Sequence, residues 1–262
     1  MKTCVLNLSG NVGKSTLAVH LLGAFVPDAR IISVESINAS DATDIEALDV
    51  EELNASRFRE IFRELMVNDD VIVDVGASNV GAFMAEMERF RSSVGEFDHV
   101  LIPTVPADKQ QRDTVATIDW LAKLGVDPSK VRVIYNQYPS QALEPVEIAY
   151  AVVAGYAATD GKGKAVYEPY AVISANEVFE LAKSSRKTIA ALAQDSTDWR
   201  TVRAEAKRAG DWPALEQAMT GQMTHDLAVS AQHNLAEVHA LLFPQLPATA
   251  PVTAAATKTR RA

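Results

Sequence analysis

Cysteine is almost absent: Cys4 is the only one among 262 residues. One thiol cannot form an internal disulfide, and it cannot supply the several thiolates of a structural zinc site. The first residues also lack the long apolar region and the small-residue cleavage site of a signal peptide. These absences are typical of a protein of the reducing cytosol, so the sequence predicts a cytoplasmic location.

Long apolar runs and an excess of positive charge are missing as well. No stretch approaches the roughly 18 consecutive apolar residues that cross a bilayer, so we expect no membrane association. The 25 Lys and Arg residues against 34 Asp and Glu give a net charge of -9 at pH 7. This balance argues against attraction of the whole molecule to nucleic acid, although a local basic patch is compatible with it.

The first two thirds of the chain alternate short β-rich runs with amphipathic helical segments. The predicted strands, several of them near-continuous apolar runs, are Thr3–Leu8, Arg30–Glu35, Val71–Val75, His99–Val105, Val131–Gln137 and Lys164–Ile173. The predicted helices are Lys14–Phe25, Ala55–Val67, Val80–Arg91, Ala107–Leu124, Pro145–Ala154 and Asn176–Ala193. This order predicts an α/β fold, a mostly parallel sheet with helices on both faces and ligands at the carboxyl ends of its strands.

A glycine-containing loop, Ser9-Gly-Asn-Val-Gly-Lys-Ser-Thr16, joins the first predicted strand to the first predicted helix. Leu8 stands where the usual P-loop (Walker A) pattern has its first glycine, but the strand–loop–helix setting is the one that a P-loop requires. Loop amides and the helix N-terminus would bind phosphate oxygens. The alternative is a glycine turn before an ordinary helix. The candidate nucleotide-binding residues are Ser9, Gly10, Asn11, Val12, Gly13, Lys14, Ser15 and Thr16.

Individual roles follow from the chemistry of these side chains. Lys14 would reach the β- and γ-phosphates, Ser15 would coordinate magnesium, and Thr16 would lie near the α-phosphate. A second element, the apolar strand that ends at Asp74, has the form of a Walker B acid that holds magnesium. An acidic residue at a strand end is common, so a structural role for Asp74 is the alternative.

Taken together, residues 1–195 resemble the ParA/MinD group of deviant-Walker-A P-loop ATPases. The loop lies where that group has Lys-Gly-Gly-x-Gly-Lys-Ser/Thr-Thr, and Asp74-Val-Gly-Ala resembles its switch II. Val133–Asn136 resembles the strand whose terminal asparagine recognises adenine, with a plain turn residue as the alternative for Asn136. The resemblance implies a P-loop NTPase fold that binds ATP or ADP with Mg²⁺. It implies catalytic roles for Lys14 and Asp74, and metal ligation by Ser15 and Asp74.

Three departures from that group bear on activity. Ser9 occupies the place of the signature lysine that reaches the nucleotide of a dimer partner, and a hydroxyl cannot supply its charge. Ile37 falls where a carboxylate would position the attacking water, and Asp41 is the candidate to replace it as a catalytic residue. Asn11 replaces a glycine, which asparagine tolerates if φ is positive. We therefore expect a weak, magnesium-dependent ATPase at most.

The pattern changes after residue 197. We expect a P-loop nucleotide-binding domain over 1–197, a helical extension packed on it over 198–244, and a disordered low-complexity tail over 245–262. The extension contains the predicted helices Trp199–Ala209 and Pro213–Leu242. The second has no Lys or Arg between Asp211 and Pro244, which argues against a membrane-surface helix. Its apolar stripe comprises Leu215, Met219, Met223, Leu227, Ala231, Leu235, Val238 and Leu242.

The leading hypothesis is an ATP-binding ParA-like switch that serves plasmid partition, plasmid stability or conjugative transfer, because Asp74–Ser78 resembles the switch of that subgroup. The alternatives are a non-hydrolysing nucleotide-binding adaptor and a small-molecule ligase or kinase. Expected partners are a protein of the same partition or transfer system, a second copy bound in the presence of nucleotide, and non-specific DNA. DNA would contact a basic face, for which a plain solvated surface is the alternative: Lys183, Arg186, Lys187, Arg200, Arg203 and Lys207.

Overall fold

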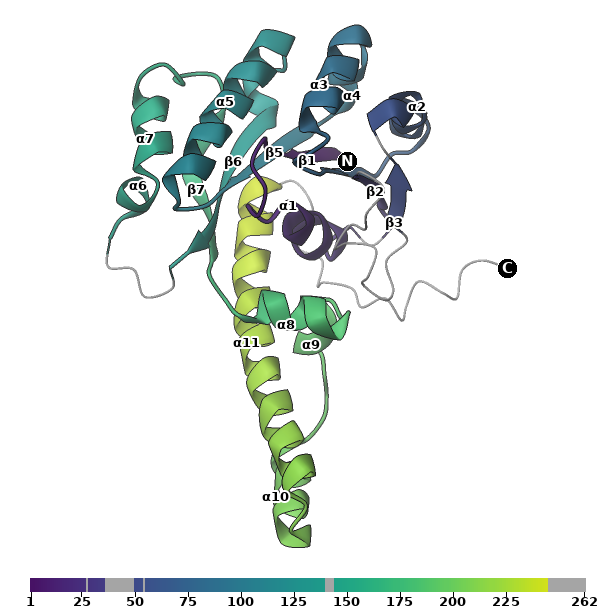
Figure 1. Ribbon diagram of the computed structural model, residues 1–262, viewed down its shortest axis with the longest axis vertical. Helices are drawn as coiled ribbons and strands as arrows, with labels where there is room; N and C mark the ends of the chain where they lie inside the picture. Colours follow the sequence, from purple (N-terminus) through teal and green to yellow (C-terminus); the bar gives the residue numbers. More distant parts are fainter. Residues whose placement is uncertain (27, 36–49, 54, 140–143, 245–262) are drawn as a thin grey trace.

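The computed structural model describes residues 1–26, 28–35, 50–53, 55–139 and 144–244. A seven-stranded sheet lies at its centre, in the order β3-β2-β4-β1-β5-β6-β7 (Figure 1). The strands are β1 (Lys2–Leu6), β2 (Arg30–Val34), β3 (Val50–Leu53), β4 (Val71–Val75), β5 (His99–Thr104), β6 (Val131–Tyr138) and β7 (Val166–Ser174). Every ladder between these strands is parallel, which confirms the predicted α/β fold.

Helices cover both faces of the sheet (Figure 1). One face carries α2 (Phe58–Val67), α3 (Val80–Arg89), α4 (Ser93–Glu96), α5 (Asp108–Leu124), α6 (Val146–Ala149) and α7 (Ala151–Ala158). The other carries α1 (Lys14–Thr16), α8 (Val178–Ser185), α9 (Ile189–Ala193) and α11 (Trp212–Leu242). Because successive strand residues point to opposite faces, Cys4 and Leu6 enter the first core and Val5 enters the second. Strands buried on both sides explain the near-continuous apolar runs.

Several predicted helices are divided in the structure. The first continues from α1 as a π-helix over Leu17–Gly23. The predicted segment Pro145–Ala154 breaks at Tyr150, between α6 and α7. The predicted helix Asn176–Ala193 ends at Arg186, whose φ of 54° is left-handed, and a new helix starts where Thr188 accepts a hydrogen bond from the Ala191 amide. Side-chain capping and a left-handed residue therefore interrupt a pattern that the apolar spacing alone makes continuous.

The C-terminal helices form a hairpin that projects from the body (Figure 1). Helix α10 (Trp199–Ala209) ends at Gly210, whose φ is 68°, and Asp211 caps α11 by accepting a hydrogen bond from Ala214 N. The C-terminal half of α11 belongs to the core beneath the sheet, where its buried residues include Ala228, Ala231, Leu235 and Val238. The N-terminal half extends beyond the body and packs against α10 instead.

Gly221 allows the hairpin to close. A Cβ at this position would overlap the ring of Trp199 on α10. We expect Gly221→Ala to lower the free energy of unfolding by about 1–3 kcal/mol, because overpacking outweighs the gain of about 1 kcal/mol in helix propensity. Urea titration measures this effect. Gly155→Ala on α7, where nothing lies within 4 Å of the added Cβ, is the control and should be neutral or stabilising. Equal effects of the two substitutions would contradict the packing role of Gly221.

Among the described helices, none combines the length and the apolar character that are needed to cross a bilayer.

Candidate functional site

The loop after β1 turns through left-handed residues. Asn11 has a φ of 56° and Gly13 a φ of 88°, so asparagine meets the condition on which it can replace a glycine here. Asn7 anchors the start of the loop, because its Nδ2 donates to Pro103 O at 2.8 Å and its Oδ1 accepts from Ser9 N at 2.8 Å. The loop is therefore held to the neighbouring strand β5 before it turns.

Asn136 supports the loop from beneath. Its Nδ2 donates to Val12 O at 2.9 Å, and its own carbonyl accepts from the Tyr150 hydroxyl at 2.7 Å. A Cβ on Gly13 would overlap this amide nitrogen, so Gly13 is required by close approach as well as by its positive φ. The adjacent Gln137, also left-handed with a φ of 58°, lines the cavity above.

Lys14 lies across the loop with only 8% of its surface exposed. Its Nζ donates to Ser9 O at 2.7 Å. Burial lowers the pKa of the ammonium, and the negative charges of Asp74 and Glu35 act in the opposite direction. Asp74 is 1% exposed on β4, beside Val5 in the sheet register. A buried ammonium that is influenced by two carboxylates is thus held at the end of β1 and β4.

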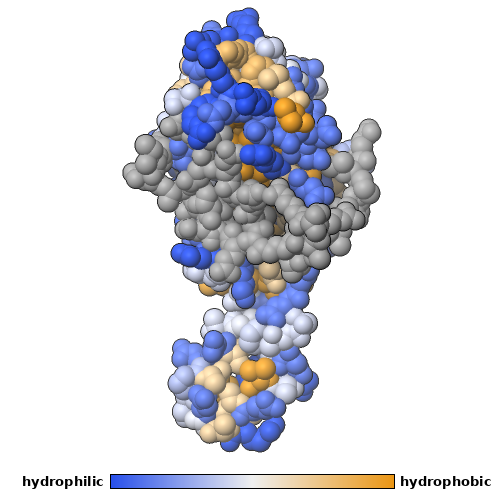
Figure 2. Space-filling model, turned by 90° about the vertical axis from the view of Figure 1, so that its right-hand side faces the viewer, coloured by the Kyte–Doolittle hydropathy of each residue, from blue (hydrophilic) through white to orange (hydrophobic). Residues whose placement is uncertain are grey.

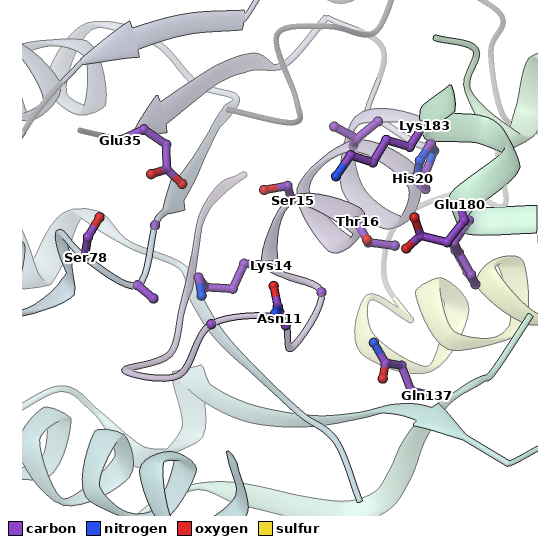
Figure 3. Close-up of a pocket in the computed structure, with 16 residues that line it drawn as sticks. Asn11, Lys14, Ser15, Thr16, His20, Glu35, Ser78, Gln137, Glu180 and Lys183 are labelled. Carbon is purple, nitrogen blue, oxygen red and sulfur yellow. The ribbon is translucent and has the colours of Figure 1, made fainter. Parts of the chain in front are cut away.

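A cavity of about 540 Å³ opens above the loop, at the carboxyl ends of the parallel strands, where ligands bind in open α/β sheets. Figure 3 shows Glu35 and Ser78 on one side of Lys14, and His20, Glu180 and Lys183 on the other. The cavity is lined by Gly10, Asn11, Gly13, Lys14, Ser15, Thr16, Val19, His20, Glu35, Gly76, Ala77, Ser78, Gln137, Phe179, Glu180 and Lys183.

Six predicted nucleotide-binding residues line this cavity and the remaining ones do not. Ser9 and Val12 are 2% and 0% exposed and lie in the buried part of the loop. Asp113 on α5 lies near the Ser9 hydroxyl, and its pKa is lowered first by the hydrogen bond from Lys109 and to a smaller extent by Ser9. Asn136 faces the underside of the loop, and Asp41 lies outside the described residues. The six lining residues are Gly10, Asn11, Gly13, Lys14, Ser15 and Thr16.

Helix α8 forms one wall of the cavity, which the sequence did not indicate. Lys183, predicted to belong to a basic DNA-binding face, lines the cavity instead. Arg200, Arg203 and Lys207 lie apart from it on α10 in the distant hairpin (Figure 1), where Nη1 of Arg203 donates to Gln222 Oε1 at 2.8 Å. The predicted set of six basic residues therefore does not form a single surface.

Two buried histidines make stability depend on pH. Burial lowers the pKa of both His20, beside the cavity, and His239 on α11 to about 4. In the unfolded chain, both histidines ionise near the ordinary histidine pKa of about 6.5. Between pH 6.5 and 4 the unfolded chain therefore binds protons that the folded chain does not bind. The free energy of unfolding should therefore fall with decreasing pH, by about 1.4 kcal/mol per pH unit for each histidine.

Urea titrations at several pH values measure this dependence. His239 stacks on Phe25 with ring centroids 4.4 Å apart, and its buried Nε2 has no hydrogen-bond partner among the described residues. His239→Phe should keep the stack and reduce the pH slope. The control, His233→Gln, changes a side chain that is 79% exposed and should leave the slope unchanged. An unaltered slope in His239→Phe would refute the assignment.

The residues present fit a triphosphate with magnesium. Gly10, Asn11 and Gly13 of the left-handed loop line the cavity, the Lys14 ammonium is buried beside it, and Ser15 lines it as well. No cluster of three or more His, Cys, Asp or Glu among the described residues could hold a metal by itself. Magnesium here would therefore share its ligands with phosphate oxygens and water, as it usually does in nucleotide sites.

Two solved structures have a fold similar to that of this chain. MinD cell division protein from Aquifex aeolicus is 15% identical with a TM-score of 0.52, over 94% of this chain and 99% of that chain. The chain has the P-loop fold of MinD. The septum site-determining protein MinD from Pyrococcus horikoshii, solved with Mg-ADP, is 15% identical with a TM-score of 0.50, over 91% of this chain and 96% of that chain.

A third solved structure is similar to this chain, whereas the sequence comparisons find no match. An ATP complex of a McdA variant from Cyanothece is 16% identical with a TM-score of 0.45, over 88% of this chain and 96% of that chain. No protein-family model and no curated protein matches the sequence. The two MinD structures thus confirm the predicted P-loop NTPase fold at low sequence identity.

Proposed function

We propose that this chain is an ATP-binding, magnesium-dependent switch of the ParA/MinD type. The observation that carries the proposal is the buried Lys14 ammonium, held across a left-handed loop between a parallel strand and a helix. In this assignment Lys14 binds the β- and γ-phosphates, and Ser15 and Asp74 hold magnesium. When bound, Mg-ATP supplies an activated phosphoryl group.

The protein side of the switch is the pair of segments after β2 and β4. Glu35 follows β2, Gly76 follows β4, and a Cβ on Gly76 would overlap the Glu35 carboxylate. Glu35 lines the cavity beside Lys14, as do Gly76, Ala77 and Ser78. A phosphate that draws Lys14 away from Ser9 O would change the balance of charge facing Glu35 and Asp74. These segments would transmit the change to a partner protein, as switch loops do.

Hydrolysis should be slow. Ser9 is 2% exposed and its side chain is an uncharged hydroxyl, so this position brings no charge to the γ-phosphate. Asp41 stays the proposed replacement for the missing catalytic carboxylate. The same observation favours a second candidate, a nucleotide-binding adaptor that does not hydrolyse ATP.

Steady-state phosphate release separates the two candidates. A slow ATPase should release phosphate faster than Asp74→Asn, whose magnesium ligand is weakened, and Asp41→Asn should also be slower. Equal background rates in all three proteins, with nucleotide binding retained by the unchanged chain, would favour the adaptor. Absence of nucleotide binding would overturn both.

The biological role proposed for this switch is plasmid partition, plasmid stability or conjugative transfer in the cytoplasm, together with a partner protein. The likeness of Asp74–Ser78 to the switch of that subgroup supports it. Loss of plasmid retention or of transfer frequency in a Lys14→Ala strain is the expected result, and normal inheritance and transfer would refute the role.

Non-specific DNA binding through α10 is proposed as an additional contact. Its affinity should fall steeply with salt, and Arg200→Ala with Lys207→Ala should reduce it.

A further inference from the structure

An apolar stripe is exposed on the projecting half of α11. Trp212, Met219 and Met223 are 71%, 46% and 56% exposed. They are spaced by seven and four residues, so they lie on one side of the helix. Val202 on α10 adds a further apolar side chain that is 38% exposed. Exposed apolar residues that gather in this way are typical of protein interaction sites.

This stripe lies on a different side of α11 from the side that packs against α10. Helix α10 contacts α11 through Trp199, which packs on Gly221, and through the hydrogen bond from Arg203 to Gln222. At 100° per residue, Gly221 lies about half a turn from Trp212. Figure 2 shows the hairpin below a narrow waist, with apolar residues gathered on the visible face and hydrophilic residues around them.

The two helices of the hairpin carry opposite charge. Helix α10 with its capping residue Asp198 contains four basic and two acidic side chains, whereas the projecting half of α11 with its capping residue contains three acidic side chains and no Lys or Arg. A surface that pairs with itself about a two-fold axis meets its own charges in reverse order. Antiparallel hairpins from two copies can therefore place each basic helix on an acidic one. The basic residues of α10 are Arg200, Arg203, Lys207 and Arg208, and the acidic residues of the projecting half of α11 with its cap are Asp211, Glu216 and Asp226.

We propose that two copies of this chain associate through their α10–α11 hairpins, with the stripe at Trp212, Met219 and Met223 in the interface. The contact has the form of an antiparallel four-helix bundle. The hairpin projects away from the phosphate loop (Figure 1), so this association does not need nucleotide. The projecting half of α11 is only about 24 Å long, so the interface is smaller than the roughly 800 Å² per partner of standard complexes, and we expect a dissociation constant on the order of 10 µM.

Sedimentation velocity of the full chain without nucleotide tests the proposal. From about 1 to about 300 µM, a range that brackets the expected affinity, the weight-average mass should rise from one chain to two. The double variant Met219→Glu with Met223→Glu should raise the dissociation constant at least about tenfold, because it buries charge at an apolar contact. High salt should weaken the association of the unchanged chain.

The matched control places the same charges on another exposed apolar surface. Met66 and Val67 on α2 are 55% and 74% exposed, and Met66→Glu with Val67→Glu should leave the association unchanged. Circular dichroism and thermal melting verify that both double variants fold. A chain that stays monomeric at the highest concentration would overturn the proposal and favour a different protein as occupant of the stripe. Association that the hairpin variant leaves intact, or that appears only with nucleotide, would overturn it too.

Discussion

Lys14→Ala is expected to weaken the binding of ATP with magnesium by at least about 100-fold. Charge-assisted hydrogen bonds contribute about 1.5–3 kcal/mol each, and we propose that Lys14 gives two phosphates such bonds. Two bonds correspond to a factor of at least about 100 in the dissociation constant. The side chain has little freedom to lose, because it is 8% exposed and already bonded to Ser9 O within the loop.

Isothermal titration with a non-hydrolysable ATP analogue and magnesium measures this loss. Lys187→Ala is the matched control, because Lys187 is an exposed lysine between α8 and α9 that does not line the phosphate cavity. This control should bind the analogue like the unchanged chain. Equal affinity of Lys14→Ala and the unchanged chain would show that the loop does not bind the triphosphate.

Gly13→Ala is expected to abolish nucleotide binding and to lower the free energy of unfolding by about 2–4 kcal/mol. About 1–2 kcal/mol comes from forcing a side chain to a φ of 88°. The remainder comes from the overlap of the new Cβ with the amide of Asn136, which is buried and bonded to Val12 O. Relief of this overlap would displace the loop that is proposed to hold the phosphates.

Two further variants separate the contributions. Gly125 has a φ of 82° and nothing within 4 Å of an added Cβ, so Gly125→Ala should show the backbone cost without the overlap. Asn136→Ala in the background of Gly13→Ala should recover part of the lost stability, and urea titration of all four members of the cycle measures this coupling. A Gly13→Ala protein no less stable than Gly125→Ala would contradict the close packing of loop and β6.

Most of the sheet could be predicted because its strands are buried on both faces and are therefore apolar throughout. Strand β3 was missed, since Val50-Glu-Glu-Leu53 has two charged residues in four and no apolar run. Among the described strands it lies at the edge of the sheet, beside β2. Helix α11 forms over nearly the predicted range Pro213–Leu242, but the two halves of its apolar stripe have different surroundings. Helical periodicity does not show where the body ends and the projecting hairpin begins.

The loop at residues 9–16 could be predicted because its residues are contiguous in the sequence. The opposite wall could not, because Lys183 reaches the cavity only through the position of α8 after the edge strand β7. The prediction for Asn136 shows a further limit. Neighbouring strand residues face opposite sides of the sheet. The side chain of Gln137, whose φ is positive, lines the cavity. The amide of Asn136 instead donates to Val12 O on the underside of the loop. Adenine recognition by Asn136 stays a prediction.

A crystal structure with a non-hydrolysable ATP analogue and magnesium tests the central claim most directly. We predict a triphosphate enclosed by the amides of residues 10–16, magnesium beside Ser15, and Lys14 Nζ moved from Ser9 O to the phosphates. A loop that stays empty at saturating analogue, with Lys14 still bonded to Ser9 O, would contradict the account.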